Sequence, residues 1–343
     1  MPVKLTASDI QSTPTINKEW SDENLIILFS LPRSGSTLLQ RILAADGRIA
    51  STAESWLLLP LFYSLREGNT FSEYGHTSAS KAIHDFIRHL PNGERDYRRA
   101  MARTALDLFR NASPDGVRYY LEKTPRNALI TEEIMDVFPN ARYIFLWRNP
   151  LAVAASMIQT FGRGRWNLYR FEIDLYQGLD RLVRAVSLPV KHKLSIRYED
   201  LLQSPRDIML RLSSLLDLDF DQNILRNFSG IRLHGRMGDP TGVREYNDLS
   251  TAPLEKWKQI LATPLRRRWA RQYLDRIGAE RLDAMGYSRT EMMQALNELD
   301  VRTFDVFSDS ARLAYGFFAG RLPVSIIRIR RNSPRHHKSN WLS

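Results

Sequence analysis

Short apolar segments of strand length alternate along the chain with segments in which apolar residues recur at helical spacing. The segments of strand length are residues 25–31, 48–53, 118–122, 141–147 and 193–198. Helical patterns are expected at residues 37–45, 54–65, 131–137, 150–159, 161–187 and 205–216, with two more helices within residues 81–112. This alternation predicts an α/β fold with a mostly parallel central sheet flanked by helices. Ligands of such folds bind at the carboxyl ends of the strands.

The first apolar strand leads through a short polar loop, residues 32–37, into a helix. Free backbone N–H groups and the positive end of the helix dipole converge at such a loop, so it is predicted to bind an anion. Gly35 lets the backbone approach that anion closely. The side chains that add charge or hydrogen bonds are those of Arg33, Ser34, Ser36 and Thr37. The alternative is an ordinary turn between a strand and a helix.

Composition and charge indicate which classes of protein this chain can belong to. The 343 residues are 43% hydrophobic, which is enough for a sizeable core, and their formal net charge is +11. Because six Lys and Arg residues and no acidic residue lie from Arg321 onward, the body is only mildly basic and a nucleic-acid partner is not expected. The chain has no Cys, no signal-peptide pattern and no apolar stretch long enough to cross a bilayer. We therefore expect a cytoplasmic protein without a metal site.

Three stretches, in this order, carry a resemblance to a known family. They are Leu31-Pro-Arg-Ser-Gly-Ser-Thr-Leu-Leu39, Glu122-Lys-Thr-Pro-Arg126 and Arg148-Asn-Pro-Leu-Ala-Val-Ala-Ala-Ser156. Together they resemble the sulfotransferases that use 3′-phosphoadenosine 5′-phosphosulfate (PAPS), in their bacterial, carbohydrate and tyrosylprotein branches. The similarity covers roughly residues 25–260. It implies a P-loop-like three-layer sandwich, PAPS as the donor and no metal.

The resemblance also assigns residues to the donor. The loop of Arg33, Ser34, Gly35, Ser36 and Thr37 would hold the 5′-phosphosulfate. Arg148 and Ser156 would hold the 3′-phosphate, Tyr198 would lie near the adenosine, and Ser250 and Lys256 would belong to a late loop that grips the donor. Three of these residues have a simpler structural explanation. Arg148 could mark the start of a helix, Tyr198 could be a core tyrosine, and Ser250 could be a helix cap.

Three residues are expected to act on the transferred group. Glu54, predicted to begin an apolar helix, is the candidate general base for the acceptor, and its alternative is a first-turn acid. Arg33 matches the cation for the leaving oxygen, and Lys123 matches the cation for the sulfuryl group. The role of Arg126, at the same anion or at the acceptor, stays open.

Two other functions and several acceptors remain open at this point. One alternative is a P-loop-like kinase of a small metabolite, although Ser36 stands where the nucleotide-binding P-loop has Lys. The other is a non-catalytic nucleotide-binding protein associated with a membrane. The acceptor is a small molecule, a sugar, a lipid or a peptide, held by variable loops such as 62–80 and 161–180. The oligomeric state is unknown.

The chain is expected to contain one main domain with two flanking segments. Residues 1–23 form a flexible lead-in, residues 24–290 the sulfotransferase domain, and residues 291–343 a helical, amphipathic extension with a basic tail. Residues 301–330 combine aromatic and aliphatic residues with arginines. A helix packed on the domain is the favoured interpretation. A peripheral contact with the inner membrane surface is the alternative.

Overall fold

The computed structural model describes residues 20–68, 70, 72–221, 223–235, 237–238, 249–303 and 306–319. Most of the expected lead-in lies outside this described part. So do residues 239–248 of the expected late loop and the basic tail beyond residue 319.

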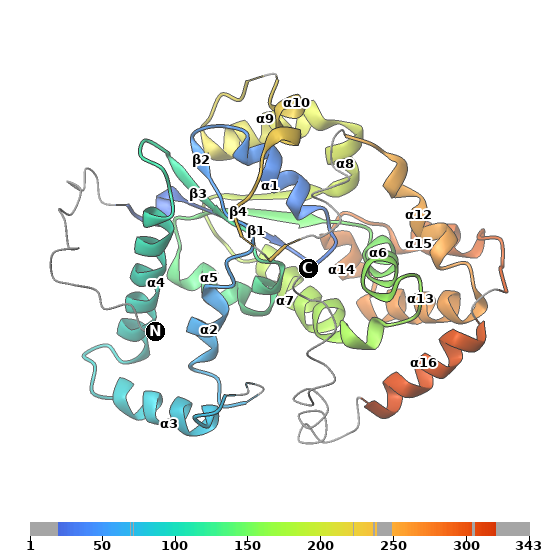
Figure 1. The fold of residues 1–343 in the computed structure, drawn as a ribbon, viewed down its shortest axis with the longest axis horizontal. Coiled ribbons are helices and arrows are strands. Elements are labelled where there is room, and N and C mark those ends of the chain that lie inside the picture. Colours follow the sequence, from blue (N-terminus) through green and yellow to red (C-terminus); the bar gives the residue numbers. More distant parts are fainter. Residues whose placement is uncertain are drawn as a thin grey trace, which may run out of the picture.

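A five-stranded parallel sheet forms the centre of the molecule, with strand order β2-β3-β1-β4-β5 (Figure 1). The strands are β1 (Leu25–Ser30), β2 (Ile49–Ala50), β3 (Tyr119–Glu122), β4 (Arg142–Trp147) and β5 (Lys193–Arg197). Every residue of β1 is buried, as expected for the central strand of a sheet covered on both faces. Because all pairs are parallel, the segments that follow β1, β3 and β4 emerge at one edge. The predicted α/β fold is confirmed.

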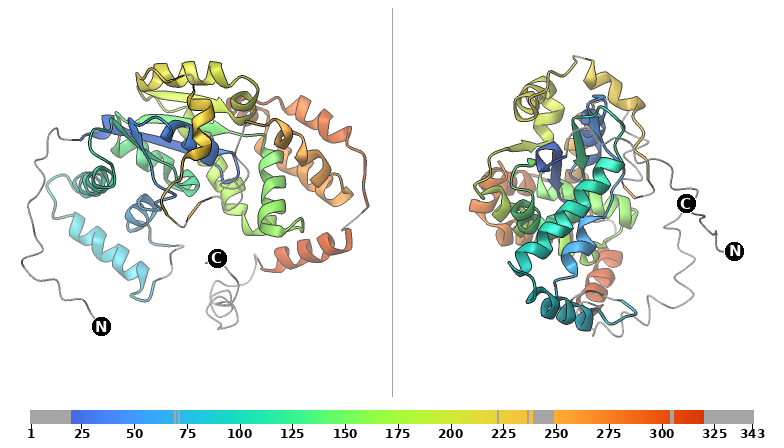
Figure 2. Two further views of the ribbon diagram at one scale, coloured as in Figure 1. Left: turned by 45° about the horizontal axis from the view of Figure 1, so that its top comes forward. Right: turned by 90° about the vertical axis from the view of Figure 1, so that its left-hand side faces the viewer.

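Helices cover both faces of this sheet. The α-helices are α1 Ser36–Ala44, α2 Leu58–Tyr63, α3 His76–Ile87, α4 Glu94–Asn111, α5 Thr131–Val137, α6 Pro150–Gly162, α7 Leu179–Val186, α8 Tyr198–Gln203, α9 Pro205–Leu216, α10 Ile224–Asn227, α12 Lys256–Ile260, α13 Pro264–Ile277, α14 Ala279–Ala284, α15 Arg289–Asn297 and α16 Val306–Ala319. Ile26 and Leu28 of β1 pack towards α1, α8 and α9, whereas Ile27 and Phe29 pack towards the opposite face. Helices α3 and α4 lie at one end of the sheet, and α13, α15 and α16 lie at the other (Figures 1 and 2).

Four expected elements differ from the structure. The helix predicted from Glu54 begins only at Leu58, because Trp56 has a left-handed backbone (φ 54°) that breaks the helical path. The strand predicted at 48–53 pairs only over β2, since the Ser51 side chain instead bonds the Leu121 carbonyl. The variable loop expected at 62–80 already turns into α3 at its end. Residues 161–187 form a 3₁₀ turn (Leu168–Arg170), a π-helix (Ile173–Gly178) and α7, so they are no single helix.

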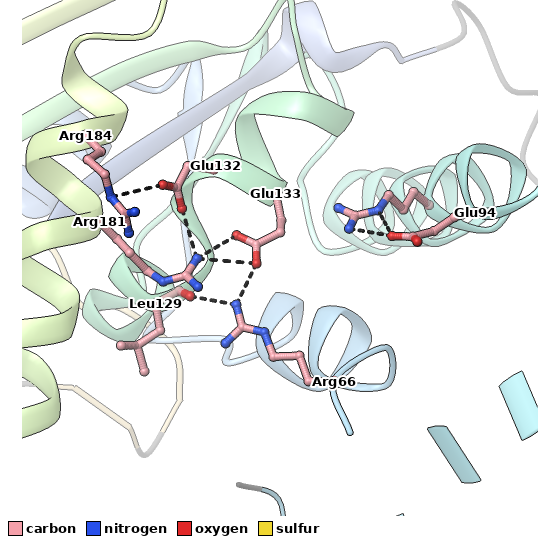
Figure 3. A network of polar contacts seen from close by, with 8 residues as sticks. Arg66, Glu94, Leu129, Glu132, Glu133, Arg181 and Arg184 are labelled. Carbon is pink, nitrogen blue, oxygen red and sulfur yellow. Dashed lines mark hydrogen bonds and ion pairs between the residues drawn. The ribbon is translucent and has the colours of Figure 1, made fainter. Parts of the chain in front are cut away.

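A network of ion pairs ties the end of α2 to α5 and α7 (Figure 3). Arg181 contacts Glu132 at 2.9 Å and Glu133 at 3.2 Å. Arg66 reaches Glu133 at 2.6 Å and also donates to the Leu129 carbonyl at 2.9 Å. The carboxylate of Glu133 therefore joins two arginines that are far apart in the sequence, Arg66 and Arg181.

Removing the central arginine of this network is expected to lower the free energy of unfolding modestly. For Arg181→Ala, we expect a loss of about 1 kcal/mol, because its pairs are partly exposed and screened by salt. Arg184→Ala is the matched control, since Arg184 is 58% exposed, and should change stability by less than about 0.5 kcal/mol. Urea unfolding at low and high salt measures both. Equal losses for the two variants would contradict the network's role.

The last described helix is held to the domain by a buried ion pair. Arg266 of α13 donates to both carboxylate oxygens of Asp309 in α16, at 2.6 and 3.0 Å, and both side chains are at most 2% exposed. The guanidinium also donates to the Ile260 and Gly164 carbonyls, so it is well satisfied. None of the described helices combines the length and apolar content needed to cross a bilayer.

The core does not stop at the expected domain boundary. Met292 and Leu296 of α15 belong to the main apolar core on the α13 side of the sheet. The division at residue 290 and the membrane contact of the extension stay predictions.

Candidate active site

At the centre of the polar loop after β1, the backbone adopts a conformation that requires glycine. Gly35 has φ 87°, and a Cβ placed there would lie 2.2 Å from the ring of Tyr198. Arg33 also has positive φ, 70°. Tyr198 is 1% exposed, so its ring forms a buried floor beneath the loop. The loop therefore takes its shape from α8, an element distant in sequence, as well as from its own residues.

The expected 3′-phosphate residues converge on Arg33. Arg33 Nε donates to Ser156 Oγ of α6 at 3.2 Å, and Arg148 Nη1 donates to the Arg33 carbonyl at 2.8 Å. The Arg148 guanidinium lies over the Tyr198 ring, 4.6 Å from its centroid. Its Nε is buried and has no hydrogen-bond partner within the described part of the chain. A buried donor of this kind fits an anionic oxygen.

The described part of the late loop contacts this cluster at Arg148. Arg148 Nη2 lies 3.4 Å from the carbonyl of Pro253, in the 3₁₀ turn Ala252–Leu254. Ser250 is exposed and its Oγ accepts from Ala252 N at 3.2 Å, which is the capping role given as its alternative. Lys256 is exposed at the start of α12. The donor contacts expected of Ser250 and Lys256 stay predictions.

Two of the three residues expected at the transferred group, Glu54 and Lys123, contact each other, whereas Nε of the third, Arg33, donates to Ser156. Lys123 Nζ lies 3.2 Å from Glu54 Oε1 and 3.4 Å from Thr37 Oγ1 in the loop. The Lys123 side chain is 1% exposed and that of Glu54 is 13% exposed. Glu54 Oε2 accepts from Trp56 Nε1 at 3.2 Å. Both carboxylate oxygens of Glu54 thus accept a hydrogen bond. Lys123 links Glu54 to the anion loop, because its Nζ contacts both Glu54 and Thr37.

The backbone of Glu54 is held by a segment 180 residues later in the chain. The N–H groups of Ala53 and Glu54 donate to the carbonyls of His234 (2.9 Å) and Met237 (3.2 Å). Between those carbonyls lies Gly235, with φ 133°, where a Cβ would come 2.7 Å from the Cβ of Ala53. This close approach fixes the position of the candidate base.

A methyl group at Gly235 should displace Glu54. We expect Gly235→Ala to lower turnover by about 10-fold while donor affinity is retained, since small displacements of a reacting group are costly. Ala53→Gly in the same chain removes the contact but not the backbone strain of Ala at φ 133°, so it should restore part of the activity. Gly230→Ala, where a Cβ meets nothing within 4 Å, is the control. Steady-state kinetics decide, and full activity of Gly235→Ala would contradict this role.

Comparison with known proteins decides the family. A model described as Sulfotransferase family matches residues 26–222, more than half of the chain. The chain belongs to the sulfotransferase family. The resemblance drawn from its three motifs is confirmed.

Relatives and solved structures agree with this sulfotransferase assignment. Nodulation protein NoeE of Sinorhizobium fredii (strain NBRC 101917 / NGR234) is 30% identical over 142 residues, which cover 40% of this chain and 32% of NoeE. The chain thus spans about a third of NoeE. A putative protein-tyrosine sulfotransferase of Caenorhabditis briggsae is 23% identical over 68% of this chain and 81% of its own. The sulfotransferase domain from the curacin biosynthetic pathway has a TM-score of 0.50 and 25% identity, covering 72% of this chain and 96% of its own.

Sequence reasoning gave no role to Glu122, one of the buried carboxylates of this sulfotransferase. It accepts hydrogen bonds from Ser55 Oγ (2.9 Å), Thr124 Oγ1 (2.7 Å) and Asn127 Nδ2 (3.2 Å). Burial raises the pKa of Glu122, and these hydrogen bonds oppose the rise. Because Ser55 follows Glu54, Glu122 anchors the base segment to β3. The only signal in the sequence was an acidic residue closing an apolar strand.

Proposed function

We propose that this sulfotransferase moves the sulfuryl group of PAPS to a hydroxyl or amine of an acceptor, with Glu54 as general base. The observation that carries the proposal is the position of Lys123, between Glu54 Oε1 and the Thr37 hydroxyl of the anion loop. An ammonium group has three N–H donors. Two are directed at these neighbours, which leaves one for an oxygen of the transferred group.

The residues present fit a donor with phosphate at both ends of its ribose. The loop of Arg33 to Thr37 would take the 5′-phosphosulfate, using backbone N–H groups at the start of α1 and the hydroxyls of Ser34, Ser36 and Thr37. Arg148 and Ser156 would take the 3′-phosphate. The buried Nε of Arg148 supports this assignment, because a phosphate oxygen would supply the acceptor that the described residues do not.

The geometry supports an in-line displacement. The acceptor oxygen would attack the sulfur as Glu54 takes its proton, and the bond from sulfur to the bridging phosphate oxygen would break. Lys123 would donate to the sulfuryl oxygens, while Arg33 would stabilise the charge that develops on the leaving phosphate. Glu54 and Lys123 contact each other at 3.2 Å, so the candidate base and the candidate cation lie side by side.

The acceptor class follows neither from the fold nor from the relatives' names, which include a nodulation protein and protein-tyrosine sulfotransferases. Sulfuryl transfer from ³⁵S-labelled PAPS to a panel of sugars, phenols, tyrosine peptides and lipid alcohols tests the reaction. We expect label in at least one class, with release of 3′,5′-adenosine bisphosphate (PAP). Phosphoryl transfer from ATP without any sulfuryl transfer would favour the kinase alternative.

A further inference from the structure

The contacts around the base continue outward to two further residues. Trp56, whose indole donates to Glu54, lies beneath the guanidinium of Arg126, 5.9 Å from its ring centroid. Arg126 in turn donates from Nε and Nη2 to the two carboxylate oxygens of Asp174, each at 3.1 Å. Successive contacts thus link the anion loop to the π-helix. Their order is Thr37, Lys123, Glu54, Trp56, Arg126 and Asp174.

Asp174 is placed by an unusual backbone. It lies in the π-helix Ile173–Gly178, within the segment 161–180 that was expected to line the acceptor pocket. π-Helical turns are rare and occur frequently at functional sites. The Asp174 side chain is 2% exposed and is paired with Arg126. Burial raises the pKa of Asp174, while the charge of Arg126 opposes that rise.

Arg126 keeps one nitrogen available. Its Nε and Nη2 are occupied by Asp174, but Nη1 has no hydrogen-bond partner among the residues that the structure describes. The side chain is 35% exposed, so the guanidinium is partly open to solvent. A bidentate partner and an aromatic ring hold the guanidinium in one orientation. It is therefore a fixed hydrogen-bond donor, linked to Glu54 through the Trp56 ring.

Charge balance restricts what such a donor recognises. Arg126 and the buried Asp174 form a neutral unit when paired, so an incoming carboxylate or phosphate would gain little from the cation and would face the nearby anion. A neutral oxygen, in contrast, takes a directed hydrogen bond from Nη1 at no cost in charge. An acceptor seated at Glu54 would need that second oxygen close to its reacting hydroxyl.

We propose that Arg126, oriented by Asp174, is an acceptor-positioning residue that selects neutral acceptors carrying a second hydroxyl beside the reacting one, as in a diol or a sugar. This inference rests on the proposed function and names its substrate class. It also gives Arg126, whose role the sequence left open, a place on the acceptor side.

Three probes that differ at one group test this. They are cyclohexanol, trans-cyclohexane-1,2-diol and 2-hydroxycyclohexanecarboxylate, each offered with ³⁵S-labelled PAPS. We expect kcat/KM for the diol to exceed that for cyclohexanol by about 10-fold, the effect of one hydrogen bond. Arg126→Met should bring this ratio close to one, mainly through KM for the diol. Arg170→Met, on an exposed nearby arginine, is the control and should keep the wild-type ratio.

The variant Asp174→Asn changes the charge beside Arg126. It should alter the preference between acceptors, which a purely structural role of Asp174 would not do. Asp174→Asn keeps the size of the side chain but leaves the charge of Arg126 unbalanced, so kcat/KM for the carboxylate probe should rise relative to the diol. An unchanged ratio in Arg126→Met, a wild-type preference for the carboxylate, or transfer to no probe by a protein that binds PAP would each overturn the inference. Absence of PAP binding would instead overturn the proposed function itself.

Discussion

Glu54→Gln is expected to lower turnover by about 10²- to 10⁴-fold, the usual contribution of a general base. The amide keeps the size of the side chain and can still accept from Trp56, but it cannot take a proton from the acceptor. Donor affinity should persist, because Glu54 contacts Lys123 and not the expected 3′-phosphate residues. Transfer from labelled PAPS measures turnover, and calorimetry measures PAP affinity.

A matched variant separates this effect from a general loss of charge. Glu280→Gln changes an exposed carboxylate at the start of α14 and should leave turnover at the wild-type level. If Glu54→Gln transferred sulfuryl groups at the original rate, Glu54 would have no part in the chemistry. Loss of PAP binding in Glu54→Gln would show that the residue shapes the donor site.

Arg148→Ala is expected to raise the Kd for PAP by about 10- to 100-fold, since a hydrogen bond to a charged group contributes about 1.5–3 kcal/mol. Adenosine 5′-monophosphate, which has no 3′-phosphate, provides the internal comparison. Its affinity should change little if Arg148 binds that phosphate. Calorimetric titration of both nucleotides measures the difference.

The comparison also tests a structural explanation. Arg148 donates to the carbonyl of Arg33, so its removal could act by reshaping the anion loop. In that case the affinities for PAP and for the monophosphate would fall together, which would contradict a direct contact. Arg268→Ala, on an exposed arginine of α13, is the control and should leave both affinities unchanged.

The sheet and the positions of the loops after its strands could be predicted from the sequence, because both depend on local apolar patterns. The apolar run of β1 is buried along its whole length, and a parallel sheet places the segments after β1, β3 and β4 at one edge. That rule alone brings Arg33, Lys123 and Arg148 to the same side. The meeting of Lys123, Glu54 and Thr37 is its consequence.

The features that the sequence did not predict depend on distant contacts. Glu54 was expected to start a helix, but its backbone pairs with residues 234–237 and Trp56 turns left-handed. Asp174 lies in a π-helix whose polarity pattern reads as an ordinary helix. No local spacing indicates that its carboxylate meets Arg126, 48 residues earlier.

Binding of the donor PAPS at the Arg33 loop can be tested by a thermal-shift titration with PAP beside ATP and Mg²⁺. A ligand that binds only the folded protein raises the melting temperature by mass action, so no acceptor is needed. We predict a rise that grows with PAP concentration and little change with ATP. A rise with ATP and none with PAP would contradict the account, because the loop would then serve a kinase-like site.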